Sequence, residues 1–265
     1  MTGARPLPRL VFGSGAPTPG ARTLPEEIAV ALTFNGTTQA VMMATPADLT
    51  DFAYGFALTE GIATPAQIDS IDILPHPNGI ELQIWLATDA NAALSARRRH
   101  MTGPVGCGLC GIDSLDQAVR NMAPVPPSAF SMTPAQITAA IGALPAEQPL
   151  HDATHAAHAA GFWAGHLRCV REDVGRHNAL DKLAGHLARE VPQAGAILLT
   201  SRVSTDMVQK VAALRLPMII AVSAPTAEAV TLADTCGITL IGLARPDRFE
   251  AFTHTDRIRE SVHVG

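Results

Sequence analysis

Short apolar runs alternate with helical segments over the second half of the chain, and this alternation constrains the fold more than any other feature. Three runs are only four or five residues long and almost continuously apolar: residues 196–200, 218–222 and 238–241. Such strands are typical of a parallel sheet covered on both faces, because neither face of the strand suits water. The sequence therefore predicts a largely parallel, open α/β sheet.

The segments between these runs have the spacing of helices, and the last carries clear start and stop signals. Thr226 is a typical N-cap, and Gly237 is a typical helix stop. A further strand is expected over residues 162–170. Helices are expected from Pro134 and over residues 176–189, 205–214 and 227–235. The pattern predicts helices on both faces of the sheet.

The first hundred residues have the two-residue alternation of β-hairpins instead. Apolar side chains alternate from Ile28 to Phe34, and Asn35-Gly36 then supplies a two-residue turn. A second hairpin is expected over residues 70–86. Between the hairpins, a helix is expected to start with Thr45 as its cap and to stop at Gly61. The first part is therefore predicted to be a small α+β domain.

Three segments follow from these patterns. Residues 1–25 are rich in Gly and Pro, show no periodicity, and are expected to be a flexible N-terminal segment. The Pro-Val-Pro-Pro run at residues 124–127 marks the best boundary. We therefore predict a hairpin-rich domain over residues 26–125 and an α/β domain over residues 126–265.

Composition excludes several classes of protein. No apolar run approaches the roughly 18–20 residues of a membrane-spanning helix, and the N-terminus does not resemble a signal sequence. A net charge of −5 gives no global attraction for nucleic acid, and four Cys do not make a disulfide scaffold. We expect a cytoplasmic globular protein that binds neither nucleic acid nor membrane.

Two cysteines stand in a glycine-rich stretch that no regular element would tolerate. Cys107 and Cys110 form a C-x-x-C flanked by Gly106, Gly108 and Gly111. Such a pair can be a redox couple, half of a zinc site, or one nucleophilic sulfur with a helper. A structural zinc site usually has four ligands, and no second pair of Cys or His residues lies nearby in the sequence. The Arg97-Arg98-Arg99 cluster either lowers the thiol pKa or simply solvates a helix end.

Polar turns follow three of the expected strands. Ligands of open α/β sheets bind outside the carboxyl ends of strands, where helix N-termini and Arg favour anions. A phosphorylated ligand is the natural hypothesis, and ordinary helix caps with solvated arginines are the alternative. The turns are Thr200-Ser201-Arg202, Ser223-Ala224-Pro225-Thr226 and Arg245-Pro246-Asp247-Arg248.

Ionisable residues crowd together over residues 171–182. His177 and Asp181 lie one helical turn apart and share a face, so a salt-bridged surface helix is one explanation. His151, His155 and His158 have the spacing of a metal pair, but surface imidazoles on an Ala-rich helix are commoner. We expect no permanently bound metal.

Taken together, these blocks resemble the FdhD/NarQ family, the sulfurtransferases that serve as accessory proteins of formate dehydrogenase. The run of residues 172–182, Glu-Asp-Val-Gly-Arg-His-Asn-Ala-Leu-Asp-Lys, is the most specific. One departure is His151-Asp152-Ala153, where many relatives have Thr-Gly-Gly. The other matching blocks are Phe34-Asn35-Gly36, Tyr54-Gly55-Phe56, Cys107-Gly108-Leu109-Cys110-Gly111, Thr154-His155-Ala156-Ala157 and Thr200-Ser201-Arg202.

The resemblance implies a persulfide carrier with a cytidine-deaminase-like α/β/α sandwich as its C-terminal domain. A cysteine desulfurase would give sulfur to Cys107, with Cys110 assisting, and the acceptor would be the Mo-bis(molybdopterin guanine dinucleotide) cofactor, before its insertion into formate dehydrogenase. A homodimer would also suit the family. The family's cofactor-binding stretch, for the guanine-nucleotide end, falls on Leu243, Ala244, Arg245, Pro246, Asp247 and Arg248.

Two other functions remain open. A dithiol oxidoreductase would need Cys110 as much as Cys107. A non-catalytic cofactor chaperone would tolerate the loss of Cys107 but would still need Arg245 and Arg248. The sequence assigns no role to Ser201, Arg202, His155 or His177.

Overall fold

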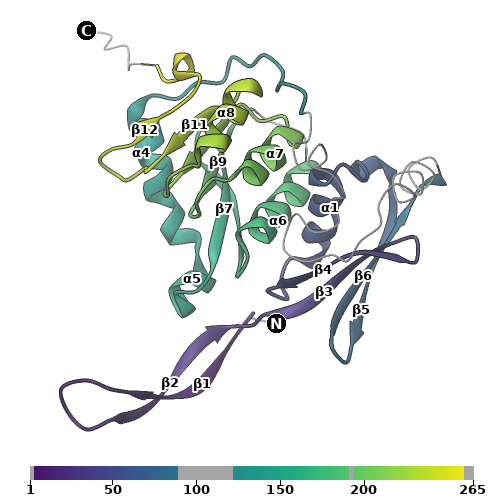
Figure 1. Ribbon diagram of the computed structural model, residues 1–265, viewed down its shortest axis with the longest axis vertical. Helices are drawn as coiled ribbons and strands as arrows, with labels where there is room; N and C mark the ends of the chain where they lie inside the picture. Colours follow the sequence, from purple (N-terminus) through teal and green to yellow (C-terminus); the bar gives the residue numbers. More distant parts are fainter. Residues whose placement is uncertain (1–2, 89–121, 191–193, 260–265) are drawn as a thin grey trace.

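The largest sheet forms the centre of the C-terminal part of the molecule. In the computed structural model, which describes residues 3–88, 122–190 and 194–259, its six strands have the order β12-β11-β10-β9-β7-β8 (Figure 1). β9, β10 and β11 run parallel, whereas β7, β8 and β12 are antiparallel to their neighbours. The strands are β7 (His158–Trp163), β8 (Leu167–Asp173), β9 (Ala196–Leu199), β10 (Met218–Ala221), β11 (Thr239–Gly242) and β12 (Glu250–Ala251).

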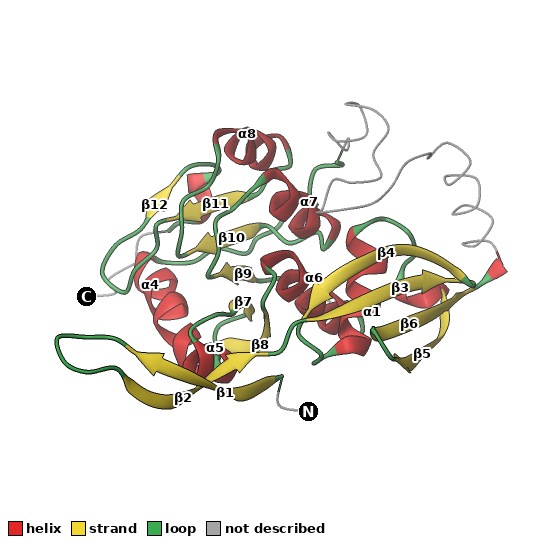
Figure 2. Cartoon of the chain, turned by 60° about the horizontal axis from the view of Figure 1, so that its bottom comes forward, coloured by secondary structure: helices red, strands yellow, loops and turns green. Residues whose placement is uncertain are grey.

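Helices cover both faces of this sheet (Figure 2). On one face lie α6 (Arg176–Ala188), α7 (Thr205–Ala213) and α8 (Ala227–Thr235), whose apolar side chains share a buried cluster with one face of the strands. On the other face lies α4 (Pro134–Ala143), which packs on Leu198 and Ile220. The predicted three-layer α/β/α arrangement is confirmed; its likeness to the cytidine-deaminase fold stays a prediction. The connecting elements are η2 (Leu144–Glu147), α5 (Pro149–Thr154) and η3 (Thr255–Arg257).

Two predictions about this sheet are wrong in detail. The sheet is mixed rather than largely parallel, because β7 and β8 form an antiparallel hairpin at one side. The single strand expected over residues 162–170 is in fact parts of these two strands. The chain reverses between them at Gly165, whose φ of 77° lies in the left-handed region that glycine adopts without strain.

The N-terminal domain is built on a four-stranded sheet of order β4-β3-β6-β5. Its strands are β3 (Ile28–Phe34), β4 (Thr37–Ala44), β5 (Ile68–His76) and β6 (Gly79–Leu86), joined by α1 (Leu49–Thr59) and η1 (Pro65–Gln67). Both predicted hairpins are confirmed. Asn35 and Gly36 have φ values of 45° and 76°, as a two-residue hairpin turn requires. α1 covers one face of the sheet through Phe52 and Phe56.

The predicted start of α1 is wrong. Asp48, in the left-handed conformation with φ 53°, is the N-cap residue, and Thr45 lies outside the helix. The Thr45 hydroxyl instead accepts a hydrogen bond from the Val174 backbone N–H, 3.2 Å away. Thr45 therefore joins the two domains rather than capping a helix.

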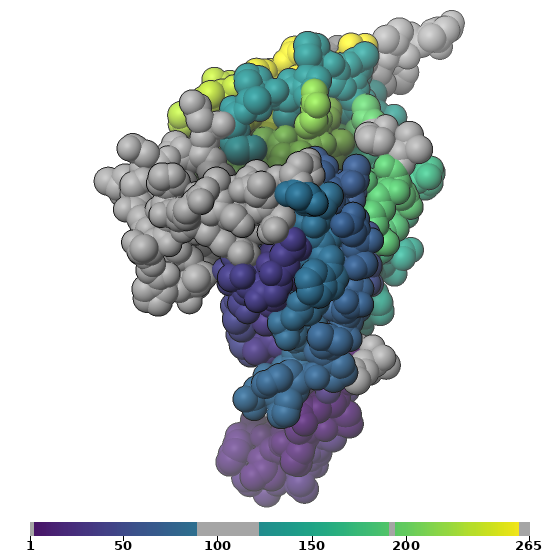
Figure 3. Space-filling view, turned by 90° about the vertical axis from the view of Figure 1, so that its right-hand side faces the viewer, coloured from purple at the N-terminus to yellow at the C-terminus, as the bar shows by residue number. Residues whose placement is uncertain are grey.

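Residues 4–25 form a β-hairpin, which corrects the expectation that this segment contains no regular structure; its flexibility stays a prediction. β1 (Ala4–Val11) and β2 (Thr18–Pro25) pair antiparallel along their whole length and project from the molecule (Figures 1 and 3). Each strand of a two-stranded ribbon has a free edge, so prolines, which lack an N–H donor, are tolerated there. Composition alone therefore misled the prediction.

The two domains meet where α1 crosses α6. A Cβ atom on Gly55 would lie 1.6 Å from the Asp181 carbonyl oxygen, and one on Gly185 would lie 1.8 Å from the Asp51 carbonyl oxygen. Only glycine allows the two backbones to approach so closely. The boundary predicted at residues 125/126 stays a prediction, because residues 89–121 are not described.

Candidate functional site: the domain joint and the carboxyl edge of the large sheet

A fully buried ion pair lies at the centre of the joint between the domains. Lys182 Nζ, on α6, is 2.6 Å from Asp173 Oδ2 at the end of β8 and 2.9 Å from the Thr45 carbonyl oxygen. The Asp173 carboxylate also accepts bonds from the backbone N–H groups of Thr45 and Gly175 and from the Asn178 amide. Every oxygen of this carboxylate is thus paired, as a charge away from water requires.

A second buried pair involves Asp181, the residue that precedes Lys182 on α6. Lys210 Nζ, on α7, is 2.9 Å from Asp181 Oδ1 and 3.0 Å from Glu60 Oε1, and the Thr59 hydroxyl donates to Asp181 across 2.6 Å. Burial alone would lower the pKa of Lys210, but Asp181 and Glu60 outweigh it and raise the pKa above its usual value. Lys210 therefore stays charged in the joint.

A third group of charged side chains joins α1 to β8 and to the C-terminal end of α6. The Asp51 carboxylate on α1 accepts from Arg171 Nε across 2.7 Å and from the Arg189 guanidinium at the end of α6. Arg171 also contacts His186 Nδ1 at 3.0 Å. Burial, and then Arg171, lower the pKa of His186.

These contacts change the interpretation of the ionisable residues at positions 171–182. The alternative of a salt-bridged surface helix is wrong for Asp181 and Lys182, which are 1% and 0% exposed. Their side chains hold α6 against the N-terminal domain. Sequence reasoning missed the partners Thr45, Asp51 and Glu60, because these are more than a hundred residues away along the chain.

The three predicted polar turns lie together at the carboxyl edge of β9, β10 and β11. Val203 pairs with Pro225 in a β-bridge, and the Leu243 N–H donates to the Ser223 carbonyl oxygen across 3.2 Å. α7 and α8 begin at this same edge, with Ser204 and Thr226 as their N-cap residues. The structure thus brings together the residues that the sequence proposed as a ligand site.

The turn of residues 243–248 has four exposed residues, 245–248, and an unusual backbone conformation at its first residue. Leu243 has φ 51°, an unusual conformation for a bulky side chain and one that accumulates at functional sites. Arg245 Nη1 donates to the Val222 carbonyl oxygen across 2.6 Å, and the Arg245 N–H donates to the Arg248 carbonyl oxygen. Arg245, Pro246, Asp247 and Arg248 are all exposed. Two guanidinium groups therefore border solvent on a turn that is held in one shape.

The other polar residues of this edge differ in their exposure. Ser201 is 4% exposed, and its hydroxyl donates to the carbonyl oxygen of Arg202, which is itself exposed. His177 Nε2 lies 3.8 Å from Asp206 Oδ2 and has no hydrogen-bond partner among the described residues. Burial, followed by Arg176 and Lys210, lowers the pKa of His177 to about 4, so its ring is neutral at pH 7. 

The histidines around α5 do not assemble a metal site. The rings of His151 and His155 meet edge to face at 5.6 Å, and Glu172 accepts bonds from the backbone N–H groups of Leu150 and His151. His155, with φ 56°, ends α5. No group of three or more His, Cys, Asp or Glu side chains suited to a metal ion occurs among residues 3–88, 122–190 and 194–259.

The cysteines divide into two kinds. Burial raises the pKa of the half-buried Cys169 to about 11 and raises the pKa of the buried Cys236 as well, so both thiols are poor nucleophiles. Cys107, Cys110 and the arginine cluster 97–99 lie outside the described residues. In the part of the chain that is described, no helix has the length and apolar character needed to cross a membrane.

Fold and site define a two-domain α+β protein, joined through buried ion pairs, with polar turns gathered at one edge of its larger sheet. The chain belongs to the FdhD/NarQ family, whose model matches residues 25–259. It is 50% identical over 260 residues to the sulfur carrier protein FdhD of Agrobacterium fabrum, with 96% of each chain covered.

Further relatives agree with this assignment. The chain is 50% identical over 246 residues to the sulfur carrier protein FdhD of Brucella abortus, with 91% of each chain covered. Among solved structures it is similar to one described as a formate dehydrogenase accessory protein, from Desulfotalea psychrophila. That match has a TM-score of 0.77 and 25% identity, and it covers 97% of this chain and 99% of the other. The family resemblance drawn from the sequence is confirmed.

Proposed function

We propose that this chain is a sulfur carrier that serves the maturation of a formate dehydrogenase. The observation that carries this proposal is near full-length similarity, at 50% identity, to proteins named sulfur carrier, in a chain that has Cys107 and Cys110 in a glycine-rich stretch. Cys169 and Cys236 have raised pKa values and suit packing rather than chemistry. Cys107 and Cys110 remain, and we assign the sulfur to Cys107 because the resemblance to the family places the persulfide cysteine at this position.

Sulfur arrives as a persulfide on the cysteine of a desulfurase. The Cys107 thiolate attacks the outer sulfur of that persulfide, and a new S–S bond forms on Cys107. The S–S bond of the donor breaks, and its electron pair leaves with the donor thiolate, so no further oxidant or reductant is needed. The Arg97-Arg98-Arg99 cluster favours the thiolate of Cys107 because cations lower thiol pKa values. Cys110 assists.

The acceptor is the metal of a bis(molybdopterin guanine dinucleotide) cofactor, which is the client rather than a resident group. The turn of residues 243–248 suits the guanine-nucleotide end of such a client. The guanidinium groups of Arg245 and Arg248 can pair with phosphate, and the Asp247 carboxylate can accept hydrogen bonds from a guanine ring. Hydrogen bonds from Arg245 to the carbonyl oxygens of Val222 and Arg248 hold this turn in a fixed shape.

The sulfur role is tested by replacing single cysteines. Cys107→Ala is expected to leave the fold intact and to abolish formate dehydrogenase activity in a strain that depends on this protein. Cys110→Ala is expected to retain part of the activity. Full activity with Cys107→Ala would refute the carrier role and leave a cofactor chaperone, whereas equal loss in both variants would favour a dithiol oxidoreductase.

The client site is tested by GDP binding, measured by calorimetry. Removing both Arg245 and Arg248 is expected to weaken binding by well over tenfold, since a charged hydrogen bond contributes about 1.5–3 kcal/mol. Arg168→Ala is the matched control, because Arg168 is an exposed arginine on β8, far from this turn. Equal GDP affinity in the double variant and the control would show that the site lies elsewhere.

A further inference from the structure

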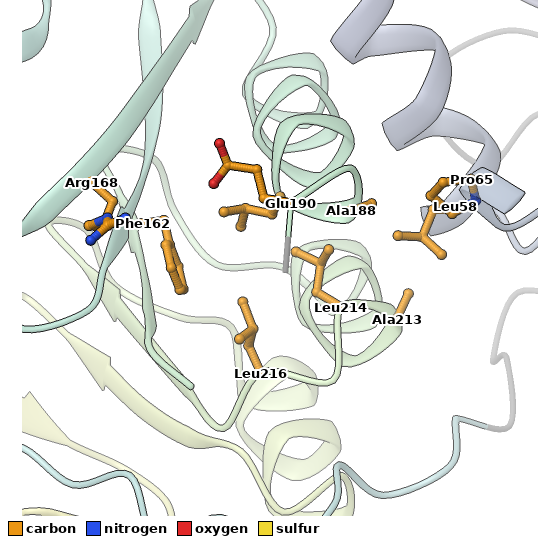
Figure 4. A pocket seen from close by; sticks show the side chains of 10 residues that line it. Leu58, Pro65, Phe162, Arg168, Ala188, Glu190, Ala213, Leu214 and Leu216 are labelled. Atoms are coloured by element: carbon orange, nitrogen blue, oxygen red, sulfur yellow. The ribbon is translucent and has the colours of Figure 1, made fainter. Parts of the chain in front are cut away.

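An apolar pocket of about 210 Å³ lies at the edge of the large sheet opposite the 243–248 turn (Figure 4). It opens between the C-terminal ends of α6 and α7, the end of α1, and the β7–β8 hairpin. Its wall is mainly apolar, with one basic side chain, Arg168 on β8, and one acidic side chain, Glu190 just after α6. Leu58, Phe162, Ala188, Ala213, Leu214 and Leu216 form most of the rest.

The size of this pocket excludes some occupants. Pockets for cofactors and drug-sized ligands usually enclose about 300–1,000 Å³. A pocket of about 210 Å³ is too small for a guanine dinucleotide but large enough for one bulky apolar side chain. Such a side chain, inserted into a desolvated pocket, is the usual anchor of a protein–protein interface.

The segment that carries Cys107 is attached on this same side of the molecule. Before it, the Ala87 N–H donates to the Gln67 carbonyl oxygen across 3.0 Å, in the short η1 helix whose first residue, Pro65, lines the pocket. After it, the Val125 N–H donates to the Cys236 carbonyl oxygen across 2.9 Å, at the end of α8. Both anchor points of residues 89–121 therefore lie toward the pocket edge, and away from the 243–248 turn.

We propose that this pocket receives a bulky apolar side chain of the protein that donates sulfur to Cys107. The inference rests on the proposed function, and it names the donor's docking point. A donor must bring its persulfide to Cys107, so its docking surface is expected beside the attachment of residues 89–121. Opposite charges on Arg168 and Glu190 would orient the donor about the inserted side chain.

The test fills the pocket without removing any packing. Ala213→Arg and Ala188→Arg each place a long cation into it from a different, partly exposed helix end. The donor used is a purified cysteine desulfurase with cysteine. Both variants are expected to weaken donor binding by about tenfold or more and to slow persulfide formation on Cys107 to a similar extent. Ala139→Arg, on the exposed face of α4, is the matched control and is expected to change neither.

A second sulfur source separates the possible occupants. With inorganic polysulfide in place of the desulfurase, the variants are expected to form the Cys107 persulfide at the unmodified rate. Slow reaction with both sources would mean that the pocket holds a segment of this same chain, and this would overturn the proposal. Unmodified rates with the desulfurase would overturn it as well. Failure of the unmodified protein to form any persulfide would refute the proposed function instead.

Discussion

Removing one member of the buried Asp173–Lys182 pair should destabilise the protein strongly and unequally. All four contacts to the Asp173 carboxylate come from donors: Lys182 Nζ at 2.6 Å, the Thr45 and Gly175 N–H groups at 3.0 and 2.7 Å, and the Asn178 amide at 3.0 Å. Asp173→Asn turns an NH₂ group toward two of these donors and removes the negative charge, so the Lys182 ammonium is left buried without a counter-ion, beside the Thr45 carbonyl oxygen and the Phe52 ring, 6.0 Å away.

The magnitude follows from the cost of an uncompensated buried charge. Breaking such a pair costs about 3–5 kcal/mol, and Asp173→Asn should lie at the upper end. Lys182→Met should lie at the lower end, because the carboxylate keeps three N–H donors. The double variant should lose at least about 1 kcal/mol less than the sum of the single variants, since neither charge is then left alone.

Urea unfolding measures all three values, and thermal unfolding provides a check. A loss of about 3 kcal/mol should lower the Tm by roughly 6–12 °C in a chain of this size. Losses below about 1 kcal/mol in both single variants, or strict additivity in the double variant, would refute the view that this pair holds the domains together.

Three further predictions concern His177, the close approach of α1 to α6, and the thiols of Cys169 and Cys236. Protonation of His177 is disfavoured in the folded state, where its pKa is about 4 against 6.5 for a free histidine. The free energy of unfolding should therefore fall by up to about 3 kcal/mol as the pH drops from 6.5 to 4. His177→Gln should flatten that part of a urea-unfolding pH series, and an unchanged slope would contradict the pKa assigned to His177. Gly55→Ala should cost more than about 2 kcal/mol, because its Cβ meets the Asp181 backbone, whereas Gly142→Ala, with no atom within 4 Å, should be neutral or stabilising; equal unfolding free energies would show that the helices do not approach so closely. Iodoacetamide at pH 8 should spare Cys169 and Cys236 in the folded protein, and peptide mapping that finds them modified as fast as in urea would disprove their burial.

Local patterns predicted most of the elements correctly. Asn35-Gly36 defines its hairpin turn through the conformations that these two residues adopt easily, and Thr226 caps α8 through a bond from the Ala229 N–H. The gathering of polar turns at one sheet edge was also predictable, because successive parallel strands end on the same side. In each case, the information lies within a few residues of the element.

The wrong or missing predictions depend on contacts between distant parts of the chain. Thr45 looks like a helix cap until Asp173 and Val174, more than 120 residues away, take its polar groups. A surface helix was one explanation for the run that ends at Lys182, because nothing near this residue in the sequence shows that Asp173 is buried with it. Of the features the predictions missed, the β7–β8 reversal had a local signal, in Gly165.

The central claim is that Cys107 carries sulfur, and intact mass spectrometry after incubation with a cysteine desulfurase and cysteine tests it most directly. We expect the mass of one additional sulfur atom, removable by reductant, on the peptide that contains Cys107. A protein that gains no sulfur and instead shows a disulfide between Cys107 and Cys110 would contradict the claim and favour a dithiol oxidoreductase.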